Sequence, residues 1–423
     1  MLLAIILFAI SYVLILMFSK YRPYIALGSA TIFILTGMLP ARDILGALDF
    51  NVLMMIAGTM GLVALFIESK MPALLADFIM EKVPNVQWAA VALALFAGII
   101  SAFIDNVATV LMVAPVALAI CKKLKINPVP FIIGISVSSN LQGAATLVGD
   151  TTSILLGSAL DMSFLDFFWY HERPSIFFSV ELGAIISALI LAYLFRKEKG
   201  AIPKATERTK VTDYVPTVLL CGVIVLLIFA SFIPNKPSIT NGLICCVLLA
   251  IGLVYSYIRK KELSAITAPL KEIDFNTIGL LTGLFLMIGG ISAQGVIDAA
   301  ANLLAEAGGG NIFLLYTVVV WASVLISAFI DNIPYVATMI PVIAGLATSL
   351  GVDPTVLYFG LLSGATLGGN CTPIGASANI TGIGILRKDG YEVKNSDFFR
   401  IGIPFTLAAI IPAYIYIWIM YGV

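Results

Sequence analysis

The sequence contains few charged residues. Lys, Arg, Asp and Glu make up 11% of its 423 residues, against about 25% in ordinary soluble proteins. The 24 basic residues equal the 24 acidic ones, so the formal net charge is zero. This balance excludes both a general basic surface for nucleic acid and an acidic, disordered tail. No nucleic-acid partner is therefore expected.

Residues that build enzyme active sites and metal sites are also scarce. The chain has one histidine, and its five cysteines have neither zinc-type nor redox spacing. No nucleotide-binding fingerprint, Ser/His/Asp set or HExxH-type metal motif occurs. We therefore expect no enzymatic activity, no cofactor and no firmly predicted metal site. Any energy from ATP would have to come from a separate ATPase subunit.

Hydrophobic residues, in contrast, are abundant. They form 60% of the chain, and the mean hydropathy is +1.05. This composition predicts an all-α polytopic protein of the plasma (inner) membrane, with the lipid bilayer as its surroundings. The apolar run that begins at Leu2 has no basic residues before it and no small-residue cleavage site, so we expect a first membrane span rather than a signal peptide.

Two kinds of apolar segment can be distinguished by length. Some runs are long enough to cross a hydrocarbon core of about 30 Å once. Four others, of roughly 35 residues, would reach about 50 Å as single helices, which is too long for one crossing and too short for two. We interpret these four as re-entrant hairpins or broken helices. The plain runs are 2–18, 22–39, 51–67, 174–195, 214–234, 239–258, 276–293 and 401–421, and the interrupted ones are 87–121, 128–160, 311–347 and 354–386.

The chain contains an internal duplication. The hexapeptide Ser-Ala-Phe-Ile-Asp-Asn at 101–106 recurs at 327–332, an offset of 226 that continues to Gly149 and Gly375. Upstream, Asp49-Phe50-Asn51 recurs as Asp274-Phe275-Asn276 at an offset of 225. The sequence therefore divides into an N-terminal repeat, a linker and a C-terminal repeat. Their bounds are 1–196, with hairpin 87–121 and broken helix 128–160; 197–213; and 214–423, with hairpin 311–347 and broken helix 354–386.

The positions of the basic residues predict the orientation of the repeats. If each hairpin returns to its own side, each repeat makes five crossings, and the second copy is inverted. Of the 24 basic residues, 21 then lie on one side, and only Arg42, Arg173 and Lys236 lie on the other. The positive-inside rule favours this arrangement of ten crossings and two hairpins, with a cytoplasmic linker at 196–213 and both termini outside. Every Lys and Arg would then lie in a loop.

Three acidic residues lie inside the interrupted stretches: Asp105, Asp150 and Asp331. A carboxylate at membrane depth costs several kcal/mol unless it faces a cavity, a partner or an ion. Asp105 and Asp331 lie where the hairpins turn, so each could cap a helix, but capping alone leaves the charge uncompensated. We expect ion or proton binding, which is compatible with capping.

Polar residues, glycine and proline surround these aspartates. Unwound backbone at this depth is tolerated only where it lines a cavity or is buried in protein, although close helix packing explains some of the glycines. We therefore predict a central site, with a possible sodium site at Asp105, Asn106, Asp331 and Asn332. The candidate binding residues are Asp105, Asn106, Thr109, Ser139, Asn140, Thr146, Asp150, Thr151, Asp331, Asn332, Asn370, Thr372, Ser377 and Asn379.

At 101–115, 327–341 and 367–379 the sequence resembles the arsenite permease and melanosomal P-protein group. This group lies within the ion transporter superfamily, which also holds citrate and dicarboxylate carriers and one type of sodium/proton antiporter. The resemblance covers nearly the whole chain. It implies two inverted repeats, each with a re-entrant hairpin and a broken helix, and secondary-active transport by an elevator-like movement, often in a homodimer.

One departure from the group's pattern concerns the substrate. Arsenite and P-type proteins usually continue Gly-Asp with Pro-Pro-Asn, whereas here Gly149-Asp150 is followed by Thr151-Thr152-Ser153. Dicarboxylate carriers have Ser-Asn-Thr at each hairpin tip, where this chain has Asp-Asn, and a carboxylate there would repel a dianion.

Three functions remain open. The first is a proton- or sodium-coupled antiporter or efflux carrier for a small ion or a metalloid such as arsenite, which suits buried aspartates without intramembrane basic residues. The second is a sodium-coupled anion or dicarboxylate (citrate-like) uptake carrier, which would hold its substrate with helix N-termini, hydroxyls and a co-bound cation. The third is an ion channel of the same fold.

Overall fold

The computed structural model describes residues 1–201 and 208–422, and their regular structure is almost wholly helical. The one strand pair in these residues joins β1 (Trp169–Tyr170) to β2 (Arg173–Pro174). Within these described residues, seven helices are long and apolar enough to cross a membrane. The helices of the first half are α1 (Leu2–Met17), α2 (Arg22–Leu35), α3 (Ile44–Ala47), α4 (Phe50–Glu68), α5 (Met71–Lys82), α6 (Val86–Ser101), α7 (Asn106–Leu124), α8 (Val129–Gly143), α9 (Thr151–Ala159) and α10 (Ile176–Leu194).

The helices of the second half follow one another in the same order as those of the first. Short 3-10 turns occur at Ser19–Tyr21, Ala41–Asp43, Leu165–Phe167 and Gly369–Cys371. The helices are α11 (Val215–Ser231), α12 (Thr240–Lys260), α13 (Ser264–Lys271), α14 (Phe275–Ala293), α15 (Val296–Gly308), α16 (Ile312–Ser327), α17 (Asn332–Leu350), α18 (Thr355–Gly368), α19 (Ser377–Lys388) and α20 (Asn395–Tyr421).

Each of the eight plain apolar runs contains one helix with shifted ends, but α1, α2 and α11, of 16, 14 and 17 residues, are shorter than the expected full span. The first copy's second helix ends at Leu35, before Gly37, whose positive φ of 72° belongs to a turn. The last helix begins at Asn395, ahead of the apolar run, because the Asp397 side chain accepts a hydrogen bond from the Lys394 N–H and caps a polar first turn.

Each of the four interrupted stretches consists of two helices. In the first copy, α6 and α7 are joined by residues 102–105, and α8 and α9 by residues 144–150. In the second copy the joints are 328–331 and 369–376. Asp105 and Asp331 are the N-caps of α7 and α17, so the expected capping is present: their Oδ1 atoms accept hydrogen bonds from the backbone N–H groups of Val107 and Ile333, respectively.

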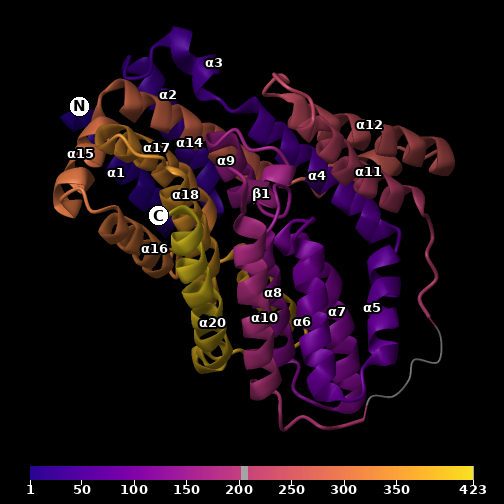
Figure 1. The fold of residues 1–423 in the computed structure, drawn as a ribbon. Coiled ribbons are helices and arrows are strands. Elements are labelled where there is room, and N and C mark those ends of the chain that lie inside the picture. Colours follow the sequence, from indigo (N-terminus) through magenta and orange to yellow (C-terminus); the bar gives the residue numbers. More distant parts are fainter. Residues whose placement is uncertain (202–207, 423) are drawn as a thin grey trace.

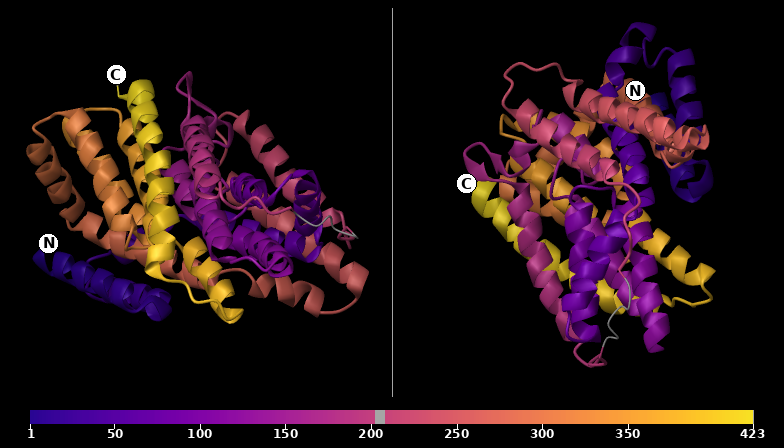
Figure 2. Two further views of the ribbon diagram at one scale, coloured as in Figure 1. Left: turned by 90° about the horizontal axis from the view of Figure 1, so that it is seen from below. Right: turned by 90° about the vertical axis from the view of Figure 1, so that its right-hand side faces the viewer.

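The helices form two packed groups (Figures 1 and 2). The first, here called the frame bundle, consists of α1, α2, α4, α11, α12 and α14, with α2 packed on α14 and α4 on α12. The second, the hairpin bundle, consists of α6–α10 and α16–α20. In it α6 packs on α8, α16 on α18 and α10 on α20. Figure 1 shows α10 and α20 side by side at the centre, between the hairpin helices of the two copies.

The centre of the hairpin bundle is made by α8 and α18. Every residue of α18 is buried, and so is every residue of α8 except Pro130. Both helices are polar near their C-terminal ends, where Ser139, Asn140 and Thr366 have no exposed surface. The fold therefore buries polar groups at the C-terminal ends of both helices, next to the segments that lead to α9 and α19.

Candidate ion-binding site

The hairpin tips contact the irregular segments that follow α8 and α18. The Thr146 hydroxyl donates a hydrogen bond to the carbonyl of Ala102, and the Thr372 hydroxyl donates one to the carbonyl of Ala328. These residue pairs are related by the offset of 226 found in the sequence. The duplicated motifs therefore build the same local contact twice.

Glycine is needed where these segments meet. A Cβ on Gly149 would lie 2.5 Å from the carbonyl oxygen of Gly143 and 2.8 Å from that of Ala102. A Cβ on Gly375 would lie 2.6 Å from the carbonyl oxygen of Gly369. Because no side chain tolerates such distances to backbone, glycine allows each segment to approach its hairpin tip closely.

An amide network joins the two copies at the centre. The Asn106 side chain donates a hydrogen bond to Asn140 Oδ1 at 3.1 Å. Asn140 Nδ2 donates to the carbonyl of Thr366 at 2.7 Å and to Asn370 Oδ1 at 3.1 Å. Asn370 in turn donates to the carbonyl of Val137 at 3.0 Å. Since these side chains are buried, their mutual hydrogen bonds fix how the copies meet.

Asp150 lies beside this network and receives donors from both copies. Its Oδ1 accepts a hydrogen bond from the Thr151 N–H at 2.8 Å. Its Oδ2 accepts one from the Thr152 hydroxyl at 2.8 Å and one from Asn332 Nδ2 at 3.3 Å. The residue is 4% exposed. These neutral donors hold the carboxylate in place, and no basic residue of the described chain pairs with its charge.

The two aspartates at the hairpin tips differ in their surroundings. Asp105 is half-buried, and among the described residues its carboxylate accepts hydrogen bonds only from its own helix, from the N–H groups of Val107 and Ala108. Within the described chain it forms no ion pair. Asp331 forms an ion pair with Arg22, and the Nη1–Oδ2 distance is 3.1 Å.

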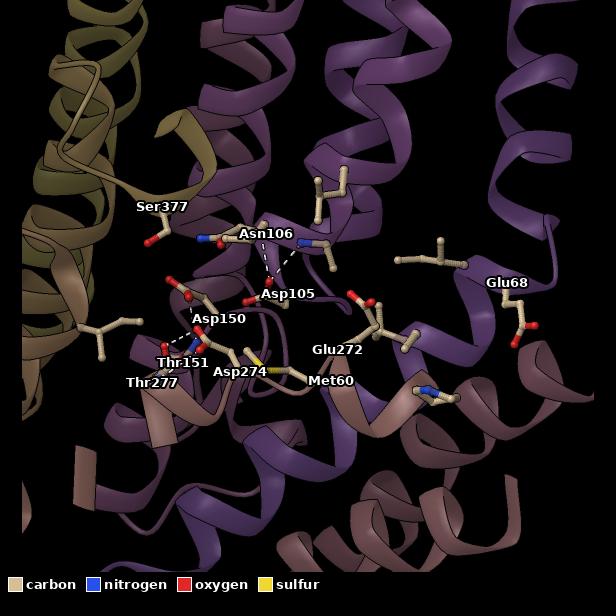
Figure 3. Close-up of a pocket in the computed structure, with 18 of the residues that line it drawn as sticks. Met60, Glu68, Asp105, Asn106, Asp150, Thr151, Glu272, Asp274, Thr277 and Ser377 are labelled. Carbon is tan, nitrogen blue, oxygen red and sulfur yellow. Dashed lines mark hydrogen bonds between the residues drawn. The ribbon is translucent and has the colours of Figure 1, made fainter. Parts of the chain in front are cut away.

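A cavity of about 550 Å³ reaches Asp105 and Asp150 from between the two bundles. Figure 3 shows Asp105, Asp150 and Asp274 in the same part of the cavity, where the first hairpin tip lies opposite the start of α14. No Lys or Arg is among the described residues that line it. The hairpin bundle contributes Asp105, Asn106, Asp150, Thr151, Asn332 and Ser377, and the other side contributes Met60, Glu68, Glu272, Asp274 and Thr277.

The remaining predicted residues lie behind the cavity wall. The Ser139 hydroxyl donates to the carbonyl of Asn106 at 3.0 Å, and Asn379 donates to that of Gly369 at 3.0 Å. Thr109 is buried, and its hydroxyl has no hydrogen-bond partner in the described residues. We therefore assign the cavity surface to six of the predicted residues. The other eight, namely Thr109, Ser139, Asn140, Thr146, Asp331, Asn370, Thr372 and Asn379, surround it.

The contribution of the frame bundle to the cavity was not predicted from the sequence. Asp274 and Thr277, at the start of α14, line the cavity, and the Thr277 hydroxyl donates a hydrogen bond to Asp274 Oδ2 at 2.6 Å. The repeated Asp-Phe-Asn motif that contains Asp274 was the available signal, because the duplication preserves it beside a membrane span.

Arg22 corrects a second expectation. All basic residues were expected in loops, away from the three aspartates, but Arg22 contacts Asp331. The flanking helices explain this. With 16 and 14 residues, α1 and α2 are about 24 and 21 Å long, shorter than the roughly 30 Å of a hydrocarbon core, so the turn that carries Arg22 need not lie outside the membrane.

Among the described residues, no group of three or more His, Cys, Asp or Glu side chains is arranged to hold a metal ion. The possible sodium site combined Asp105, Asn106, Asp331 and Asn332. Of these, Asp105, Asn106 and Asn332 line the cavity, whereas Asp331 is engaged by Arg22.

The comparison with known protein families is decisive for the class of protein. The model of the citrate transporter family CitMHS matches residues 12–364. The chain belongs to this family. It is therefore a membrane transporter, not an enzyme, as the sequence had indicated.

Relatives of this CitMHS protein extend over most of its length. An uncharacterized transporter of Mycobacterium tuberculosis is 30% identical over 428 residues, which cover 99% of this chain and 98% of the relative. A 46 kDa membrane protein of Mycobacterium leprae is 36% identical over 325 residues, which cover 76% and 74% of the two chains. The human P protein is 26% identical over 438 residues, which cover 84% of this chain and 52% of that protein. The expected similarity to the P protein is thus confirmed, while the arsenite permease branch stays a prediction.

Solved structures share the fold. The YdaH transporter of Alcanivorax borkumensis superimposes with a TM-score of 0.62 at 13% identity and covers 90% of both chains. MtrF of Neisseria gonorrhoeae, from a class of antimetabolite efflux pumps, gives a TM-score of 0.60 at 16% identity over 92% of this chain and 84% of its own. At these identities the likeness concerns the fold alone.

Proposed function

We propose that this CitMHS protein is a secondary-active transporter in which a proton or a sodium ion binds between Asp105 and Asp150. The observation that carries the proposal is the charge of the cavity: five carboxylates and, among the described residues, no basic side chain line it. Such a surface attracts cations and repels free anions. Neither carboxylate has a basic partner in the described chain, so a bound cation would compensate their charge.

The substrate that suits this cavity best is a small cation or a neutral metalloid acid such as arsenite, moved outward in exchange for the coupling ion. A neutral acid is not repelled by Asp105 and Asp150. It could accept hydrogen bonds from the Asn106 and Asn332 amides and donate one to the Ser377 hydroxyl oxygen, all on the hairpin side of the cavity.

A second candidate is uptake of citrate or a similar anion, and the family model favours it. In this cavity a citrate anion would need at least one co-bound cation, because the carboxylates of Asp105, Asp150 and Asp274 would otherwise repel it. The co-bound cation would bind the aspartates, and the amide groups of Asn106 and Asn332 would donate hydrogen bonds to the anion.

The proposed mechanism is an elevator-like movement of the hairpin bundle along the frame bundle. The proposal rests on an inverted arrangement of repeats 1–196 and 214–423, with ten crossings and two re-entrant hairpins. The linker at 197–213, of which 202–207 lie outside the described residues, would be cytoplasmic, both termini would be outside, and the membrane would be the plasma (inner) membrane. The separate packing of the two bundles supports this mechanism. A homodimer would give the frame bundle a fixed partner.

Flux measurements in proteoliposomes test the proposal. Arsenite, sodium, citrate and succinate are each offered under an imposed proton or sodium gradient. We expect gradient-driven flux of one of them, abolished in Asp105→Asn and Asp150→Asn. Asp298→Asn changes an exposed carboxylate on α15 and should leave the flux unchanged.

The possible outcomes separate the candidates. Saturable, cation-dependent citrate or succinate uptake would select the second candidate. Flux far above carrier turnover, with current in the absence of a coupling ion, would indicate a channel. Undiminished flux in both aspartate variants would overturn the proposed ion site.

A further inference from the structure

The two hairpin tips have the same sequence but opposite electrostatic surroundings. At the first tip, Asp105 faces a second carboxylate, Asp150, and no basic residue lines the shared cavity in the described part of the chain. At the second tip, the residue equivalent to Asp150 is Ala376, which carries no charge. Asp331, the equivalent of Asp105, is instead bound by Arg22.

The ion pair of Asp331 is well supported by its surroundings. Asp331 Oδ2 accepts hydrogen bonds from Arg22 Nη1 and from the Ser377 hydroxyl, both at 3.1 Å. Arg22 Nε also donates to the carbonyl of Ile15 at 3.3 Å, which ties the guanidinium to the end of α1. Asp331 is 7% exposed. Its charge is therefore already compensated inside the protein.

Arg22 has no equivalent in the second copy. At the offset of 225 that relates the upstream parts of the repeats, its counterpart is Val247, an exposed residue within α12. There the helix continues, whereas in the first copy the chain turns between α1 and α2. Because the chain turns between the short helices α1 and α2, the Arg22 side chain lies at the second hairpin tip. No basic residue of the described chain lines the cavity at the first tip.

We infer that Arg22 occupies, at the second hairpin tip, the cation position that stays open at the first tip. One exchangeable cation site then remains, at Asp105 and Asp150, and Arg22 limits the protein to one coupling cation per cycle. This inference rests on the proposed function, since it assumes that the first site binds a cation. Its physical basis is that the Arg22 guanidinium already compensates the charge of Asp331, and a guanidinium and a bound ion exclude each other at that position.

The number of bound cations can be counted without knowledge of the substrate. Purified protein in nanodiscs is unfolded by heat at increasing sodium concentration, with N-methyl-D-glucamine keeping the ionic strength constant, and separately at decreasing pH without sodium. Above the Kd, the slope of stability against the logarithm of cation concentration gives the number of cations that the folded state binds. The slope is compared for whichever of the two cations stabilises the native protein.

The expected slopes differ between variants. The native protein should bind one cation and Asp105→Asn none. Arg22→Gln leaves Asp331 without its partner, so it should bind two, and the double variant Arg22→Gln/Asp331→Asn should return to one. Arg22→Lys keeps the charge, and Lys20→Gln removes an exposed charge nearby, so both should bind one.

Two results would overturn the inference. Either Arg22→Gln still binds one cation, or Asp331→Asn alone lowers the native slope, which would mean that Asp331 binds a mobile cation despite Arg22. If Arg22→Gln does not fold, the slope of Asp331→Asn tests the inference instead. An unchanged value of one supports it, because it means that Asp331 binds no exchangeable cation in the native protein. A native slope that persists in Asp105→Asn instead contradicts the proposed ion site, so the two failures are distinguishable.

Discussion

At the scale of single residues, Asp150 shows how the copies cooperate. Its carboxylate accepts a hydrogen bond from the Thr152 hydroxyl in its own copy and one from the Asn332 side-chain amide in the other copy. Asn332 belongs to the second tip, whose aspartate is already neutralised by Arg22. The second hairpin tip therefore contributes a neutral donor to a site whose charges come from the first copy and from Glu272 and Asp274, just before α14. The two hairpin tips have the same hexapeptide sequence but contribute different groups to the site: the first contributes a charge and the second a neutral donor.

The close contacts of Gly149 and Gly375 lead to a prediction on stability. Gly149→Ala and Gly375→Ala should each destabilise the protein by about 1–3 kcal/mol, the usual cost of overpacking, because the new Cβ would lie within 2.6 Å of a backbone oxygen. Thermal unfolding in detergent or nanodiscs measures the loss. Gly384→Ala is the matched control, since a Cβ there meets nothing within 4 Å. Equal stability of the Gly149 and Gly384 variants would show that the segment shifts without cost.

The residues that carry charge at the site were partly predictable from the sequence. Asp105, Asp150 and Asp331 stand out because acidic residues are rare inside apolar stretches, and this requires no knowledge of the fold. Arg22 and Asp274 lie at the ends of apolar runs, where charge is ordinary. Only the packing shows that Arg22 contacts Asp331 across 309 positions of sequence. Pairing over such distances depends on helix depth and helix packing, which the pattern of one sequence does not determine.

At the scale of elements, the interrupted stretches were the most predictable part of the fold. Their lengths and their internal Gly, Pro and Asp residues marked the joints near 105, 150, 331 and 372, and each joint separates two helices. The short helices α3 and α13 and the β1–β2 hairpin were not predicted. Each is too short for a periodic signal, and their positions follow from the packing of loops on the ends of longer helices.

One described end of the linker is held on helix α5. Arg208 binds both carboxylate oxygens of Glu81 at 2.7 Å, and its guanidinium lies 4.8 Å from the centre of the Phe78 ring. The Thr209 N–H donates to Asp77 Oδ2 at 2.8 Å. Since α5 also packs on both helices of the first hairpin, this contact connects the linker to the hairpin that carries Asp105.

We expect Arg208→Gln to loosen this contact and raise hydrogen exchange of the α5 amides at neutral pH. The hydrogen bonds from Arg208 lower the pKa of Glu81. Its folded-state pKa thus lies below the unfolded one, so the stabilisation is present at neutral pH and is lost as pH falls through the lowered pKa. The difference from the native protein should therefore disappear in acid, and salt should reduce it.

Lys210→Gln is the control for this prediction, because it removes an exposed charge from the same segment. Exchange is followed by mass spectrometry on peptides that cover 71–82. If α5 is protected equally in the native protein and in Arg208→Gln at pH 7, the ion pair does not hold the linker.

At the scale of the whole molecule, access to the ion site differs between its two sides. The cavity that reaches Asp105 is lined by Glu68 and Glu272, at the ends of segments expected on the inner side. On the opposite side, the Ser158 hydroxyl of α9 donates a hydrogen bond to the side chain of Asp49, the N-cap of α4. This contact joins the hairpin bundle to the frame bundle. In the proposed mechanism it has to break when the hairpin bundle moves.

A reversible crosslink at this position tests the movement. In a background without the five native cysteines, Asp49→Cys and Ser158→Cys place thiols on the two contacting side chains. We expect oxidation to reduce flux in proportion to the crosslinked fraction, and a reductant to restore it, because a bond between α4 and α9 holds the bundles in one arrangement. Each single-cysteine variant, oxidised in the same way, should keep its flux. Complete crosslinking with undiminished flux would mean that α4 and α9 move together, and the sliding surface would then have to lie elsewhere, between α14 or α15 and α17, where the second hairpin packs.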